Sequence, residues 1–120
     1  MGFITYYEGA KMIEKIVGNA TAEKVLLYLT AYGEGYATAI AATFNISLNM
    51  VQKQLARFEE SGLIAATSKG RTRVYSWNPR YPFLAELKAF LEKVFQYLPE
   101  EEKERYYRER RRPRRSGKPL

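Results

Sequence analysis

Two short helical segments joined by a tight polar turn lie in the middle of this chain. Ile40 and Phe44 are four residues apart, so they share one face of a first helix. Asn45 follows at a position where a helix can end in the left-handed conformation, which asparagine tolerates. Ser47 is a favourable N-cap for a second helix. The spacing predicts a helix-turn-helix within residues 40–64, a motif whose second helix can enter the major groove of DNA.

The second predicted helix has one apolar face and one polar face. Val51, Leu55 and Phe58 form the apolar stripe, and Leu48 is expected to project near the core as well. On the polar face, asparagine and glutamine could pair with adenine, lysine could reach guanine or phosphate, and methionine could contact a thymine methyl group. The predicted DNA contacts on this helix are Ser47 at its cap and Asn49, Met50, Gln52, Lys53 and Arg57. The alternative is a pair of packed helices whose polar face meets only solvent.

A pattern typical of a β-hairpin follows the second helix. Residues 63–68 form a strand-like run, Lys69-Gly70 is a turn, and residues 71–77 alternate polar and apolar side chains. Such a hairpin with a basic tip would be the wing of a winged helix, able to reach phosphates or the minor groove. Tyr75 and Trp77 either pack beneath a C-terminal helix or stack on nucleic acid, and we favour packing. The predicted wing contacts are Lys69, Arg71 and Arg73, with a solvated strand face as the alternative.

Helix, turn, helix and wing together resemble a known family. Residues 21–77 are similar to winged helix-turn-helix transcription regulators of the broad ArsR/MarR type. Within that group, the stretches GRTRVYSWNPRYPF (70–83) and RRRPRRSGKPL (110–120) look like those of a recurrent bacterial and archaeal set of small regulators. The resemblance implies a dimer that binds specific sequences of double-stranded DNA, and it implies no known ligand, so any effector is unknown. It places base readout at Asn49, Met50, Gln52 and Lys53.

The amino-acid composition excludes most kinds of catalytic site and metal-binding site. The chain has no cysteine and no histidine, which excludes disulfides, thiolate switches and the usual zinc sites. It also lacks aspartate, a nucleophile–base constellation and a phosphate-binding loop of the Gly-x4-Gly-Lys type. We therefore expect a protein that is not an enzyme and that needs no cofactor and no metal.

The sequence shows no pattern typical of a membrane helix or of a secretory signal peptide. No apolar stretch reaches the length of about 18 residues that a membrane helix needs. The N-terminus also lacks a basic and then apolar leader. We therefore expect a cytoplasmic protein with no membrane partner.

The charge of the chain is concentrated at its C-terminus. Residues 105–120 carry eight basic residues and one acidic residue, which accounts for the whole net charge of +7. Such a block repels itself and buries little apolar surface, so it is either a solubilising end or a flexible arm for a polyanion. The predicted DNA contacts in this tail are Arg110, Arg111, Arg112, Arg114 and Arg115. The alternatives are another anionic partner, or no partner.

Helix-breaking residues divide the chain into four parts. The predicted parts are an N-terminal accessory helix (1–20), the winged helix-turn-helix domain (21–78), C-terminal helices (79–112) and a disordered basic tail (113–120). A first helix is expected over residues 4–17, and Thr21 is expected to cap a helix that runs to about Tyr32. The glycines of Gly33-Glu34-Gly35 predict a turn before the helix-turn-helix.

The C-terminal helices are the predicted dimer contact. Pro82 can serve as the first residue of a helix that runs to Leu98, and Pro99 begins a last helix that Pro113 ends. The apolar residues of the longer helix cover an arc of roughly 140° at about 100° per residue, wide enough to touch two bodies. The predicted dimer contacts are Phe90, Leu91, Val94, Phe95 and Leu98. The alternative is a helix that only completes the core of a single chain.

Taken together, these features predict a mainly α fold with a small β-hairpin wing, a winged helix-turn-helix with accessory helices at both ends. The predicted function is a dimeric, sequence-specific DNA-binding transcription regulator, acting as a repressor or autoregulator. One alternative is a protein-interaction or antitoxin-like adaptor whose partner is encoded nearby. Another is an RNA-binding module that uses the basic tail.

Overall fold

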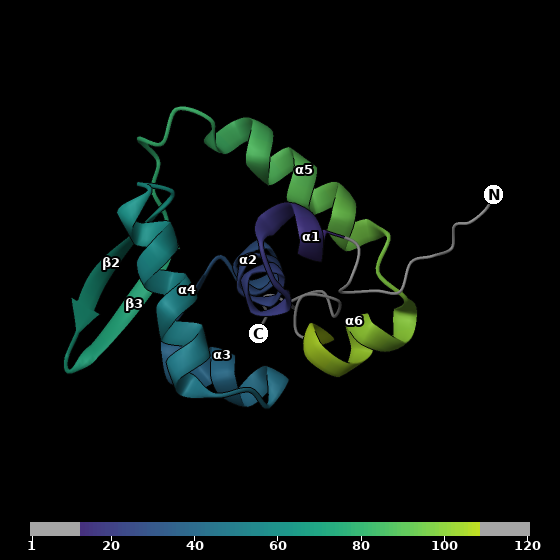
Figure 1. The fold of residues 1–120 in the computed structure, drawn as a ribbon, viewed down its shortest axis with the longest axis horizontal. Coiled ribbons are helices and arrows are strands. Elements are labelled where there is room, and N and C mark those ends of the chain that lie inside the picture. Colours follow the sequence, from purple (N-terminus) through teal and green to yellow (C-terminus); the bar gives the residue numbers. More distant parts are fainter. Residues whose placement is uncertain (1–12, 109–120) are drawn as a thin grey trace, which may run out of the picture.

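The computed structural model describes residues 13–108, which form a helical body with a β-hairpin at one side (Figure 1). The elements in chain order are α1 (Glu14–Val17), α2 (Ala20–Tyr32), β1 (Glu34–Gly35), α3 (Ala37–Phe44), α4 (Leu48–Glu60), β2 (Ile64–Lys69), β3 (Thr72–Trp77), α5 (Leu84–Gln96) and α6 (Glu100–Tyr106). The predicted class, a mainly helical winged helix-turn-helix, is confirmed. Among the helices of the described residues, none is long and apolar enough to cross a membrane.

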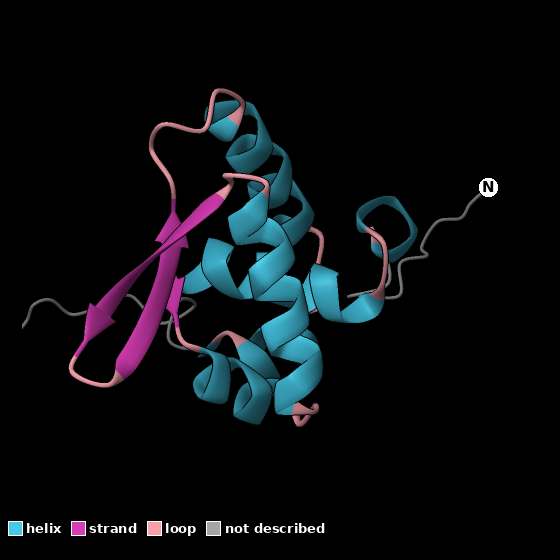
Figure 2. Cartoon of the chain, turned by 60° about the vertical axis from the view of Figure 1, so that its left-hand side comes forward, coloured by secondary structure: helices cyan, strands magenta, loops and turns pink. Residues whose placement is uncertain are grey.

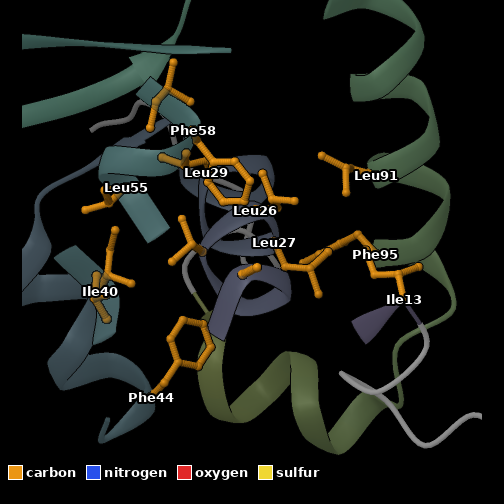
Figure 3. Close-up of a cluster of buried hydrophobic side chains, with 14 of the residues drawn as sticks. Ile13, Leu26, Leu27, Leu29, Ile40, Phe44, Leu55, Phe58, Leu91 and Phe95 are labelled. Atoms are coloured by element: carbon orange, nitrogen blue, oxygen red, sulfur yellow. The ribbon is translucent and has the colours of Figure 1, made fainter. Parts of the chain in front are cut away.

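Helix α2 is the centre of the hydrophobic core. Leu27 and Leu29 of α2 are fully buried. Figure 3 shows the side chains of α2 lying between those of α4, such as Leu55, and those of α5, such as Leu91. Burying a leucine completely contributes roughly 1.5–3 kcal/mol. The helices that carry the candidate site are therefore positioned by packing on α2.

The start of α2 differs from the prediction. Asn19, and not Thr21, is the N-cap, because the Asn19 Oδ1 accepts a hydrogen bond from the Ala22 amide at 2.8 Å. Thr21 is already helical and is buried. Of the helix predicted over residues 4–17, the described part contains only the single turn α1, and residues 4–12 lie outside the described range.

The helix-turn-helix agrees with the prediction in its local detail. Asn45 ends α3 in the left-handed region, with φ 56° and ψ 50°. The Ser47 Oγ caps α4 by accepting the Met50 amide at 3.2 Å. Val51 and Leu55 are fully buried, so one face of α4 is held on the core.

The wing is a three-stranded antiparallel sheet in the order β1-β3-β2, and it stands beside the helices (Figure 2). The predicted turn at residues 33–35 is only half correct. Gly33 does end α2 with φ 83°, but Glu34 and Gly35 pair with Ser76 and Tyr75 of β3. Two residues are too few to show the alternation by which a strand is recognised. Gly35 is required because a Cβ there would approach the Tyr28 ring to 2.5 Å.

The turn of the hairpin is one residue later than predicted. Lys69 and Thr72 are paired in the sheet, so the turn consists of Gly70, with φ 66°, and Arg71. Arg71 therefore lies in the tip of the wing and not in a strand beside Arg73.

The C-terminal helices are shorter than predicted. Pro82 lies in a turn before α5, which starts at Leu84. Helix α6 follows Pro99 as expected and ends at Tyr106. The cause is Tyr107, whose side chain is only 1% exposed and lies in the core. The Tyr32 hydroxyl also donates to the Tyr106 carbonyl at 2.7 Å, and residues 109–120 lie outside the described range.

Candidate nucleic-acid interface

The outer face of α4 presents the polar side chains that were predicted to read DNA. Exposed side chains on this face are Asn49, Met50, Gln52, Lys53 and Arg57, and the cap residue Ser47 is exposed too. The opposite face is buried against the core, so the two faces are cleanly separated. Leu48 is an exception to the prediction, because it is 39% exposed at the first turn of α4 and does not pack inside.

Arg57 is held within the chain. Its Nη2 donates a hydrogen bond to the Val17 carbonyl at 2.8 Å, and its guanidinium lies 5.0 Å from the centre of the Phe58 ring. The interaction connects the second half of α4 to the end of α1. In this structure Arg57 therefore makes an internal contact, and its role in DNA binding stays a prediction.

The predicted basic residues of the wing have different surroundings. Lys69 lies 3.8 Å from Glu34 in an exposed ion pair. Arg73 donates from Nη2 to the Glu59 carboxylate at 2.7 Å and from Nε to the Tyr75 hydroxyl at 3.2 Å. The pKa of Arg73 is raised above its ordinary value. The hydrogen bond to Tyr75 is the largest cause, and the hydrogen bond to Glu59 is the next. Arg73 therefore joins the wing to α4.

Arg71 is different because it is exposed at the tip and has no ion-pair partner among the described residues. A guanidinium presents up to five donors in a fixed plane and suits phosphate oxygens. Of the three predicted wing cations, Arg71 is thus the one most available to a ligand.

A pocket of about 320 Å³ lies between the wing, α4 and the start of α3. Its walls include Gln52 from α4 and Arg71, Arg73 and Tyr75 from the hairpin. Tyr36 and Thr38 line it at the start of α3. Neither residue was predicted from the sequence as a DNA contact. Only their position directly after β1, an element that the sequence did not reveal, could have indicated them.

The predicted dimer contacts on α5 and just after it are mostly part of the chain's own core. Leu91, Val94, Phe95 and Leu98 are at most 9% exposed and belong to the cluster around α2. Phe90 is the exception at 41% exposed. These four side chains complete the core around α2, and a part for them in a dimer stays a prediction.

An exposed aromatic stripe runs along the outer side of α5. It consists of Phe83, Phe90 and Tyr97, which are 63%, 41% and 59% exposed. Residues seven apart lie about 20° from one another around a straight helix. Phe90 lies within α5, and Phe83 and Tyr97 are its cap residues, so the three lie on one side of the helix. The Phe83 ring also contacts the ring of Tyr81, with 5.6 Å between their centres. The predicted contacts of the basic tail cannot be placed in the same way. Arg110, Arg111, Arg112, Arg114 and Arg115 all lie outside the described residues.

No protein-family model matches the chain, and no curated protein matches it significantly. Among solved structures, the chain is similar to the C30AH42A mutant of ZitR from Lactococcus lactis, with 23% identity and a TM-score of 0.49. That alignment covers 79% of this chain and 78% of the ZitR chain. The apo form of the same mutant gives 22% identity and a TM-score of 0.49, over 86% of this chain and 89% of that one. The winged-helix assignment rests on the order and packing of this chain's own elements.

Proposed function

We propose that the chain is a DNA-binding transcription regulator that reads duplex sequence with α4 and contacts the backbone with its wing. The observation that carries the proposal is the two-sided character of α4. Its inner face is fixed by the fully buried Val51 and Leu55, while its outer face exposes amide, ammonium and thioether groups beside the wing. A rigid helix with one free polar face is the arrangement that major-groove readout needs.

The chemistry of the outer face suits base recognition. Asn49 and Gln52 each carry an amide that can pair bidentately with adenine, and Lys53 can donate to guanine. Met50 is 48% exposed and can contact a thymine methyl group. The N-terminus of α4, capped by Ser47, favours an approaching phosphate through its free amides and its dipole.

We further propose that two copies associate through the aromatic stripe of α5. Phe83, Phe90 and Tyr97 expose apolar area that a second copy could cover, and an isologous contact would relate the two helices by a two-fold axis. Two α4 helices related in this way would suit half-sites whose centres lie about 10 base pairs apart. Such a protein would meet its DNA in the cytoplasm of a prokaryotic cell, and it would act as a repressor or autoregulator.

The same stripe supports a second candidate function, an adaptor that holds another protein. An exposed aromatic surface is as suitable for a partner of different sequence as for a second copy. The two candidates differ in what α4 does, because an adaptor would have no preference among DNA sequences.

Selection of duplexes from a random pool separates these candidates. The regulator proposal expects one motif to be enriched at moderate salt, with two-fold symmetry if the protein is dimeric. Binding to the enriched duplex should weaken as salt rises, because contacts to phosphates release counterions. If repeated rounds enrich no motif, the proposal of sequence-specific DNA binding is wrong and the adaptor becomes the better explanation.

A further inference from the structure

Aromatic packing fixes the last described residues of the chain on the helical body. Tyr107, the next-to-last of them, is only 1% exposed. Its ring centre lies 5.2 Å from that of Phe95 in α5 and 6.0 Å from that of Phe44 in α3. The Tyr32 hydroxyl of α2 donates to the carbonyl of Tyr106 at 2.7 Å. Contacts with three helices therefore define the point from which the chain continues.

This point lies beside the turn of the helix-turn-helix. Phe44 is the last residue of α3, and its ring centre lies 5.0 Å from that of Tyr106. Asn45 then turns the backbone, and Ser47 caps α4. In the view of Figure 1, the wing and α6 lie on opposite sides of α4. The chain therefore continues from a place near the start of α4, on the side away from the wing.

The residues that follow, 108–120, are a basic arm of the chain. They comprise seven basic residues and one acidic residue. Thirteen residues can span at most about 43 Å, at about 3.3 Å per residue. One turn of duplex DNA is about 34 Å long. The arm is therefore long enough to reach a groove next to the one that α4 is proposed to occupy.

We propose that the arm lies in the minor groove of bound DNA on the side of α4 opposite the wing, and that Tyr107 is the positioning residue that directs it there. The inference rests on the proposed function. A narrow, A·T-rich minor groove concentrates negative potential and attracts arginine. The effective concentration of a tethered group depends on where its tether begins and how long it is. An arm that starts at a fixed point should therefore favour A·T-rich DNA on one flank of each half-site.

Directed cleavage of DNA locates the arm. The chain has no cysteine, so a single introduced thiol can carry an iron chelate that cuts nearby DNA. Ser116→Cys places the chelate in the arm, and the matched Lys69→Cys places it in the wing. Each full-length protein is bound to a duplex with the selected motif, and the cuts are mapped on both strands. We expect the two sets of cuts on opposite sides of the bases that α4 reads in each half-site.

Duplexes with exchanged flanks test whether the anchor directs the arm. The motif read by α4 is given an A·T run on one flank, on the other flank or on neither, and each duplex is titrated over a range of salt. One variant carries glutamine at the five arginines of 110–112 and 114–115. A second has ten glycine and serine residues inserted after Arg108, which keeps every charge but adds about 17 Å between the anchor and the arginines. Tyr107→Ala removes the anchoring ring, and Tyr107→Phe keeps it.

The wild-type protein should bind about tenfold more tightly when the A·T run lies on the flank cut from Ser116→Cys. The glutamine variant should lose this preference and show a shallower slope of log affinity against log salt. The insertion variant and Tyr107→Ala should keep the wild-type slope but lose most of the preference, whereas Tyr107→Phe should retain both. If thermal unfolding shows that Tyr107→Ala does not fold, the insertion variant decides, because it leaves residues 13–108 unchanged.

Three outcomes would overturn the proposal while the regulator proposal stands, because the motif would still be bound. The first is a set of cuts from Ser116→Cys that falls on both flanks equally or on the flank cut from the wing. The second is a glutamine variant with the wild-type flank preference. The third is an insertion variant with that preference intact, which would mean that the anchor directs nothing. If no duplex is bound in preference to any other, the proposed function fails and this inference fails with it.

Discussion

At the scale of single residues, Glu23 is a carboxyl group buried in the core with an incomplete set of hydrogen bonds. Its side chain is fully buried in the first turn of α2. Oε2 accepts the Ile13 amide at 3.4 Å, which is long for such a bond, and Oε1 has no hydrogen-bond partner among the described residues. Burial raises the pKa of Glu23 to about 7, and the nearby carboxylates of Glu14 and Glu102 add to the rise. The Ile13 amide and Lys24 oppose it.

The raised pKa of Glu23 predicts that the fold loses stability as pH rises. The unfolded chain releases this proton near its ordinary pKa of 4.5, while the folded chain keeps it until about 7. The folded state binds more protons in that window, so the contribution is complete below pH 4.5 and is lost as pH rises through 7. A shift of this size corresponds to about 3 kcal/mol. Glu23→Gln should therefore flatten the pH dependence of urea unfolding and raise stability above neutral pH.

The control for this measurement is Glu60→Gln, which changes an exposed carboxylate at the end of α4. It should show the same pH dependence of the unfolding free energy as the wild type. A Glu23→Gln curve parallel to the wild type across the whole window would mean that Glu23 is ionised in the fold.

The proposed base contacts can be tested at Asn49, which lies on the outer face of α4 and outside the walls of the pocket. Asn49→Ala should cost about 1–3 kcal/mol on the preferred duplex and relax the preference at one base pair. The unfolding free energy should stay almost unchanged, because the side chain is exposed. Binding to the selected site and to its single-base variants measures both effects. An equal loss on every sequence would show a backbone contact and no readout.

At the scale of elements, α5 has an inner face and an outer face with different roles. Leu91 is fully buried against α2, whereas Phe90, one residue earlier, is 41% exposed. Adjacent residues on a helix are separated by about 100°, which is enough to place one inside and the other outside. The sequence pattern showed that this helix is apolar over a wide arc, and the structure divides that arc between the two faces.

The two faces predict opposite results for neighbouring substitutions. Leu91→Ala should lower the unfolding free energy by about 2–5 kcal/mol, because it leaves a cavity beside α2. Phe90→Glu should change the unfolding free energy of the monomer little but should dissociate the proposed dimer. Urea unfolding and sedimentation equilibrium at micromolar concentration measure the two effects. A wild-type chain that sediments as a monomer would contradict the role given to Phe90.

At the scale of the whole molecule, the net charge of the chain is carried by residues 105–120. Long-range attraction to DNA should therefore depend strongly on this segment, while sequence preference should depend on α4. Each neutralised phosphate contributes about −0.9 to the slope of log affinity against log salt. Replacing the five tail arginines, 110–112 and 114–115, with glutamine should make the slope shallower and leave the preferred motif unchanged. A wild-type slope in that variant would mean that the tail does not contact DNA.

What the sequence alone determined is the local part of the fold. Asn45 and Ser47 end one helix and start the next through their own backbone preferences and side-chain bonds, so the helix-turn-helix could be recognised without any distant contact. The exposed polar face of α4 followed in the same way from its periodicity. Neighbouring residues carry all of these signals.

Only the tertiary structure decided which surfaces remain free. Gly35 becomes part of a strand because β3 lies beside it, and Tyr107 ends α6 because the core accepts its ring. Arg57 donates a hydrogen bond to the Val17 carbonyl at the end of α1, and Leu91 is buried because α5 packs against α2. Each of these outcomes joins segments that are far apart in the chain. A sequence pattern shows which residues are apolar or charged, but contact between distant elements determines which of them are left for a ligand or a second copy.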